Sequence, residues 1–60
     1  MKLPKYLMDR VDEIEYTPMN EDRYEVWLKQ NWKWNGEFGA VYGNNAKDVA
    51  ARLRECEKID

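Results

Sequence analysis

The 60-residue sequence lacks histidine altogether, has a single cysteine, and contains no apolar run near the roughly 20 residues of a membrane span. Without histidine, the usual base near neutral pH is missing. One cysteine cannot form an internal disulfide, and a zinc site would need a ligand cluster that is absent. The first residues lack the apolar core of a signal peptide. These absences predict a soluble cytoplasmic protein with no metal, no cofactor and no membrane contact.

The short length predicts one compact domain, residues 1–60. A chain of this size buries only about 60% of its unfolded surface, so its stability margin is thin. Because neither a disulfide nor a metal can add stability, self-association is the remaining common way to stabilise such a small domain. We therefore expect a homodimer. The apolar fraction of 43% is too high for a disordered chain, and the net charge of −2 argues against a general polyanion binder.

The charge is distributed unevenly along the chain. Residues 1–22 carry six acidic and three basic side chains. Residues 23–43 carry two acidic and three basic side chains, and residues 44–60 carry four of each. Asp9, Asp12, Glu13 and Glu15 lack the spacing of a metal-binding loop, so we interpret them as a solvated face. Together with Glu21 and Asp22, they could supply local negative potential.

The clearest predicted element is a C-terminal helix from about Ala46 to Lys58. Its apolar residues recur at three- and four-residue steps, which places them on one stripe of a helix. Asn45 is the expected N-cap, with Asp48 near the positive end of the helix dipole. The stripe consists of Ala46, Val49, Ala50, Leu53 and Cys56.

A β-hairpin is predicted upstream. Asn35-Gly36 is the preferred type I′ pair, and it separates two runs rich in aromatic and β-branched residues, Tyr24–Trp34 and Glu37–Tyr42. A competing turn at Gln30-Asn31 would change the partners near Trp32. The main reading pairs Trp34 with Glu37, Trp32 with Gly39, and Gln30 with Val41.

Alternation along these strands sorts the side chains onto two faces. Since only one helical stripe is available, we expect it to cover the more aliphatic face and to leave an aromatic patch of Trp27, Phe38 and Tyr42 on the other. The covered face would carry Tyr24, Val26, Leu28, Trp32, Trp34 and Val41.

The first 22 residues fit two descriptions. A short helix near Pro4–Asp9 followed by a strand near Val11–Thr17 is preferred, with the chain turning back through Pro18–Asp22; a helix continuing to Tyr16 is the alternative. The predicted fold class is α+β: a three-stranded antiparallel meander with the C-terminal helix packed on one face and a short N-terminal helix.

Catalysis has little support in the sequence, and an enzyme is not expected. The glycines lack the spacing of phosphate-binding loops, and Cys56 reads as a small core residue rather than a reactive thiol. The informative feature is instead the excess of large aromatics, with three Trp, four Tyr and one Phe. Exposed aromatics with a polar rim suit a protein interface; single-stranded bases could stack there too, but a clear basic excess is missing.

The segment Phe38–Val49 resembles a junction found in the small uracil-DNA glycosylase inhibitors of Bacillus phages. The shared pattern is aromatic–x–x–aliphatic–Tyr-Gly-Asn–x–Ala–x–acid–aliphatic, carried here by Phe38, Val41, Tyr42, Gly43, Asn44, Ala46, Asp48 and Val49. The match covers about twelve of the 60 residues, and the family chain is of similar length, with strands followed by a C-terminal helix.

This resemblance implies a function and a mechanism. Members of the family are dimers that mimic DNA, occupy the DNA-binding groove of the host glycosylase, and capture an apolar side chain of the enzyme in an aromatic pocket. Phe38 and Tyr42 match the family's aromatic pair. Together with Trp27 and Glu37, they are the expected partner-binding residues of a phage protein in the host cytoplasm.

Two other functions remain in competition. A three-stranded sheet backed by one helix also resembles the arm-site domains of phage integrases, and in that reading Arg23, Lys29, Lys33 and Trp27 would contact DNA. The third reading is a phage or plasmid interaction protein that uses the same aromatic patch on another host target.

Overall fold

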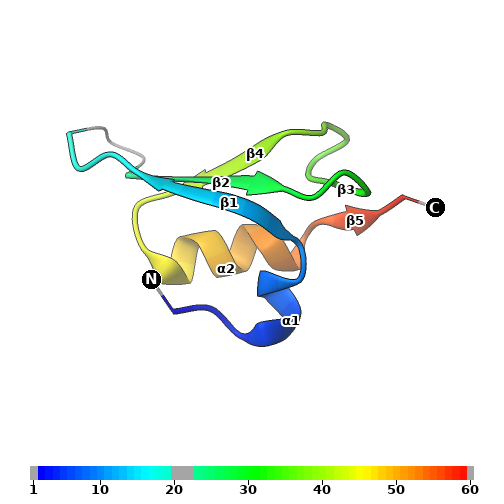
Figure 1. Cartoon of the computed structure of the whole chain (residues 1–60), viewed down its shortest axis with the longest axis horizontal. Coiled ribbons are helices and arrows are strands. Elements are labelled where there is room, and N and C mark those ends of the chain that lie inside the picture. The colour runs from blue at the N-terminus through cyan, green and yellow to red at the C-terminus, as the bar shows by residue number, and fades with distance from the viewer. Residues whose placement is uncertain (1, 20–22, 60) are drawn as a thin grey trace.

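A three-stranded antiparallel sheet with both helices on one side organises the chain (Figure 1), which confirms the predicted α+β class. The computed structural model describes residues 2–19 and 23–59, and within these ranges no helix has the length and apolarity needed to cross a bilayer. The strands of the main sheet lie in the order β1-β2-β4, and β3 and β5 form a separate two-stranded sheet. In chain order the elements are α1 (Lys5–Met8), β1 (Val11–Tyr16), β2 (Tyr24–Leu28), β3 (Trp32–Lys33), β4 (Ala40–Gly43), α2 (Ala46–Arg54) and β5 (Glu57–Lys58).

The N-terminal segment forms a short helix and then a strand, as preferred from the sequence, and the alternative of one helix to Tyr16 is wrong. Helix α1 places Leu7 in the core, with no exposure. Strand β1 then pairs antiparallel with β2, with Ile14 opposite Val26. Of the predicted turn through Pro18–Asp22, residues 20–22 lie outside the described residues.

The predicted Asn35-Gly36 turn is present, but the register assigned beyond it is wrong. Both residues have positive φ, 56° and 81°, as a type I′ turn requires, and Trp34 pairs with Glu37. The long first strand is interrupted by the competing turn, in which the Trp32 N–H donates to Lys29 O at 3.0 Å. Strand β2 therefore places Val26, and not Gln30, opposite Val41, and Trp32 faces Lys58 in β5 instead of Gly39.

Despite this error in register, the strand side chains lie on the faces of the sheet that the sequence predicted. Val26 replaces Gln30 as the partner of Val41, a shift of four residues, and an even shift leaves each side chain on the same face of a pleated strand. The aliphatic face is covered as expected. Val26, Leu28 and Val41 are buried, and Tyr24, Trp32 and Trp34 pack half-buried against this core.

Helix α2 begins where the sequence predicted and ends earlier. The Asn45 side chain accepts a 2.9 Å hydrogen bond from the Asp48 N–H, the expected N-cap. The helix stops at Arg54, not Lys58, because the chain then turns to pair as β5 with β3 and the Ile59 N–H donates to Asn31 O at 2.7 Å. Cys56 lies in the turn after the helix and is still buried. The spacing of apolar residues therefore extends beyond the end of the helix.

Gly43 allows β4 and α2 to approach closely. A Cβ at this position would lie 2.9 Å from Val49 Cγ2, 3.0 Å from Val49 N and 3.2 Å from an Arg52 Nη1. Any other residue would push the helix away from the strand that carries Val41. The Tyr-Gly-Asn junction thus contains a glycine required for packing.

Arg10 joins the two sheets and both helices. Its guanidinium donates to Leu53 O, near the end of α2, at 2.6 Å, and stacks 4.3 Å from the Trp32 ring centroid. The Tyr6 ring lies 5.9 Å from the same guanidinium. Such a stack contributes about 0.5–2 kcal/mol and orients β3 relative to the core.

Replacing Gly43 by alanine is expected to destabilise the protein. The added methyl group meets the Val49 backbone as well as its side chain, and overpacking of this kind costs about 1–3 kcal/mol. Urea unfolding followed by circular dichroism measures the change. Ala51→Ser, at an exposed position of the same helix, is the control, and equal stability of Gly43→Ala and the parent would contradict the packing role.

Candidate protein-binding surface

The sheet face opposite the helices is formed by two cross-strand rows. Residues directly opposite each other share a face, so the register places Glu13, Trp27 and Ala40 in one row. Glu15, Glu25 and Tyr42 form the second row. We call this surface the open face; Figure 1 shows both helices on the other side of the sheet, and no other helix or strand of residues 2–19 and 23–59 covers it.

Aromatic side chains are accessible on the open face. Trp27 alternates with buried Val26 and Leu28 and is 38% exposed, and Tyr42 follows buried Val41 and is 45% exposed. The Tyr42 hydroxyl donates a 3.0 Å hydrogen bond to Glu25 Oε2. This bond fixes the phenol ring relative to the neighbouring strand, so part of the aromatic surface is pre-positioned.

Negative charge is concentrated on the same face. Glu15 lies directly opposite Glu25, an arrangement in which like charges repel and destabilise a sheet. Glu13 occupies the neighbouring row, opposite Trp27. The paired positions of the open face include no lysine or arginine; Arg23 and Lys29 stand just beyond the two ends of β2.

Several basic side chains are held elsewhere, by contacts to backbone or tyrosine oxygens. Arg10 donates to Leu53 O, Arg52 donates to Tyr42 O at 2.7 Å, and the Arg54 Nε donates to the Tyr6 hydroxyl at 3.1 Å. These donors come from the α2 side of the molecule or from the α1–β1 junction. The paired positions of the open face thus carry three glutamates and no cation, with Arg23 and Lys29 at the two ends of β2.

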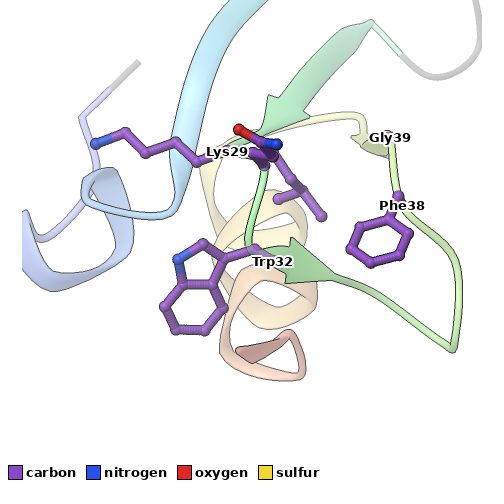
Figure 2. A pocket seen from close by; sticks show the side chains of 6 residues that line it. Lys29, Trp32, Phe38 and Gly39 are labelled. Carbon is purple, nitrogen blue, oxygen red and sulfur yellow. The ribbon is translucent and has the colours of Figure 1, made fainter. Parts of the chain in front are cut away.

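Phe38 lies in a different setting, at the rim of a hollow beside β3 (Figure 2). It is 63% exposed, and its ring points toward the space between Gly39 and Trp32. The hollow has a volume of about 410 Å³. Gly39 has φ 126°, a conformation that disfavours side chains, and its carbonyl accepts from the Leu28 N–H. The hollow is lined by Leu28, Lys29, Gln30, Trp32, Phe38 and Gly39.

The predicted partner-binding residues thus occupy three places. Trp27 and Tyr42 lie together on the open face, whereas Phe38 borders the hollow, whose lining does not include Tyr42. Glu37 belongs to the hairpin turn, where it pairs with Trp34 and is exposed.

The structure separates the residues of the Phe38–Val49 junction into two kinds. Val41 and Val49 are fully buried, Gly43 packs against Val49, and Asn45 caps the helix. Those features are accounted for by folding alone. Phe38 is 63% exposed, so core packing does not explain an aromatic residue there, whereas the partly exposed Tyr42 also donates to Glu25 on the neighbouring strand.

Three features of the structure were not predicted from the sequence. Pairing across β1 and β2 brings together glutamates that are about ten residues apart in the chain, Glu15 and Glu25. The alternation around Ile14 could have placed the β1 glutamates outward, but their partners depended on the register. Arg10 and the short strand β5 gave no periodic signal at all.

Cys56 is a core residue, as expected. It is 8% exposed, and its Sγ lies 3.5 Å from Arg52 O as a weak donor. Burial raises the pKa of the Cys56 thiol; Arg10 lowers it in part, and Glu55 raises it further. Elsewhere in the described ranges, no three His, Cys, Asp or Glu side chains are grouped so as to hold a metal ion.

Comparison with known proteins adds no relative: no protein-family model, curated protein or solved structure matches the chain.

The Cys56 thiol is expected to react slowly in the folded protein. Burial and a raised pKa leave little accessible thiolate at pH 7.5, and the thiolate is the reactive form. Absorbance with an aromatic disulfide reagent measures the rate. We expect modification at least about tenfold slower than in guanidinium chloride, where the thiol is exposed; equal rates would mean that Cys56 is accessible.

Proposed function

We propose that this protein is a small inhibitor that binds a host DNA-repair enzyme, uracil-DNA glycosylase, and blocks its DNA-binding groove by mimicking DNA. In this proposal the protein acts as a homodimer in the cytoplasm of the host cell. The observation that carries the proposal is the open face, where exposed Trp27 and Tyr42 stand among glutamates with no basic residue at a paired position.

The chemistry of the open face suits a DNA-binding groove. Such grooves are lined with lysine and arginine side chains that normally neutralise phosphates. Glu13, Glu15 and Glu25 present carboxylates that can replace those phosphates, and complementary charge accelerates association. Trp27 and Tyr42 add apolar contact area near the centre of the surface, where interface anchors contribute most of the affinity.

Phe38 provides the apolar capture element that the resemblance implies. Its ring is exposed beside a hollow whose lining includes Leu28 and Trp32, and the hollow can receive an aliphatic side chain of a partner. The family has a glutamate at the position of Gly39. The φ of 126° explains the glycine here, because a glutamate would be strained in that conformation.

The integrase-like alternative has less support. That reading lays the sheet in the major groove of DNA, and the open face would then bring Glu13, Glu15 and Glu25 toward phosphates. Lys29 lies at the end of β2, and its side chain extends away from Phe38 (Figure 2). An interaction protein with another host target would use the same open face.

Titration of the protein into a uracil-excision assay tests the proposed function. A bacterial uracil-DNA glycosylase acting on single-stranded substrate is expected to lose activity at near-equimolar inhibitor, because a DNA mimic competes for the groove. A gel-shift assay of the protein with the same DNA is the control and should show no complex. Undiminished excision at large excess would rule out this enzyme as the target.

Phe38→Ala and Tyr42→Ala are expected to weaken inhibition at least tenfold, with little change in Tm. Both side chains are exposed, so truncation removes partner contact rather than core packing. Met19→Ala is the matched control, since Met19 is 92% exposed and lies beyond the end of β1. Strong destabilisation by both aromatic substitutions, or equal losses with Met19→Ala, would contradict the assigned role.

A further inference from the structure

We infer that Arg10 is a positioning residue for the hollow beside β3, and that it keeps Trp32 and the turn after β2 where they can receive an apolar side chain of a partner. Arg10 itself is not among the residues that line the hollow. The identity of the apolar side chain rests on the proposed function, whereas the effect of Arg10 on the hollow rests on contacts within this chain.

The hollow lies beyond the end of β2, where the main sheet gives it little support. Lys29 and Trp32 stand at the two ends of the β2–β3 turn and line the hollow (Figure 2). Strand β3 has only two residues, and it pairs with β5, which also has two. An isolated two-stranded ribbon is marginally stable at best in water. The position of Trp32 therefore depends on contacts from outside the β3–β5 pair.

Arg10 supplies such contacts with both its main chain and its side chain. Its carbonyl oxygen accepts a 2.9 Å hydrogen bond from the Lys29 N–H, and the Lys29 carbonyl oxygen in turn accepts from the Trp32 N–H at 3.0 Å. The guanidinium carbon of Arg10 lies 4.3 Å from the Trp32 ring centroid. Both ends of the turn that lines the hollow are thus tied to one residue.

The guanidinium of Arg10 is held in turn by helix α2. Its Nη1 donates to Leu53 O at 2.6 Å, and Leu53 is fully buried one residue before the end of the helix. The negative end of the helix dipole favours a cation at this place. A planar guanidinium can stack on an indole and donate to a carbonyl at the same time, a combination that a lysine ammonium does not reproduce. Arg10 thereby fixes the Trp32 indole relative to the main core.

Arg54 provides a matched control for Arg10. Its Nε donates to the Tyr6 hydroxyl at 3.1 Å, and the Tyr6 ring centroid lies 5.9 Å from the Arg10 guanidinium carbon, so the two arginines share one region of the molecule. Tyr6 is not among the residues that line the hollow. Substitution by methionine removes the same positive charge at either position. A difference between the two variants therefore reports the contact with Trp32 rather than the charge.

The first test needs no enzyme. N-acetyl-leucine methylamide is titrated at millimolar concentrations into the ¹⁵N-labelled protein, and NMR follows the Trp32 indole and the Gly39 amide. The parent and Arg54→Met are expected to show saturable shifts there. Arg10→Met and Arg10→Lys should bind the probe at least about threefold more weakly, because the hollow is no longer pre-organised. No binding to the parent, parent-like binding to either Arg10 variant, or an equal loss with Arg54→Met would overturn the inference.

Circular dichroism shows whether each variant is folded at the temperature of the titration. Arg10→Lys keeps the positive charge, so it supplies a second variant if Arg10→Met unfolds. Unfolding of both variants would mean that Arg10 holds the whole fold rather than the hollow, and it would also overturn the inference.

Inhibition of the glycosylase then tests whether Arg10 acts through the hollow. Arg10→Met is expected to weaken inhibition about three- to tenfold in the parent but less than about twofold in Phe38→Ala, because the contact that Arg10 positions is already lost there. Equal losses in the two backgrounds would place the effect of Arg10 outside the hollow and refute the inference. A parent protein that binds the leucine probe in an Arg10-dependent way, yet does not inhibit the enzyme, would refute only the proposed function.

Discussion

The packing of α2 against one face of the three-stranded sheet is the contact on which the rest of this structure depends. Val49 and Leu53 of the helix and Val26 and Val41 of the sheet are fully buried. One helix of this length can cover one sheet face only, and the chain has no disulfide that could stabilise it otherwise. Gly43 sets the distance between the two layers, because its missing side chain makes room for Val49.

Because the helices cover only one face of the sheet, the second face is left to solvent, and this has a functional consequence. In many small domains such a face carries mixed, dispersed charge. Here it carries paired glutamates around Trp27 and Tyr42, while Arg52 and Arg54 of α2 donate to the Tyr42 backbone oxygen and the Tyr6 hydroxyl. The paired positions of this face therefore carry negative charge only, although the whole chain is near neutral.

The hollow beside β3 depends on a second set of contacts, distinct from the main core. Strand β3 pairs with β5 near the end of the chain, and Trp32 is stacked by Arg10, which itself binds the end of α2. Phe38 is carried on a turn held by the pairing of Trp34 with Glu37. The open face and the hollow are thus built by different elements, and a partner that used both would contact the middle of the sheet and its β3 border together.

The sequence by itself determined the elements with strong local signals. These elements could be predicted because each depends on neighbours only a few residues away. They are the helix cap at Asn45, the Asn35-Gly36 turn, and the alternation around Val26 and Val41. Only the tertiary structure decided the register, the end of α2, the strand β5 and the pairing of Glu15 with Glu25. Those features depend on which distant segments meet, and no local preference of the chain encodes that choice.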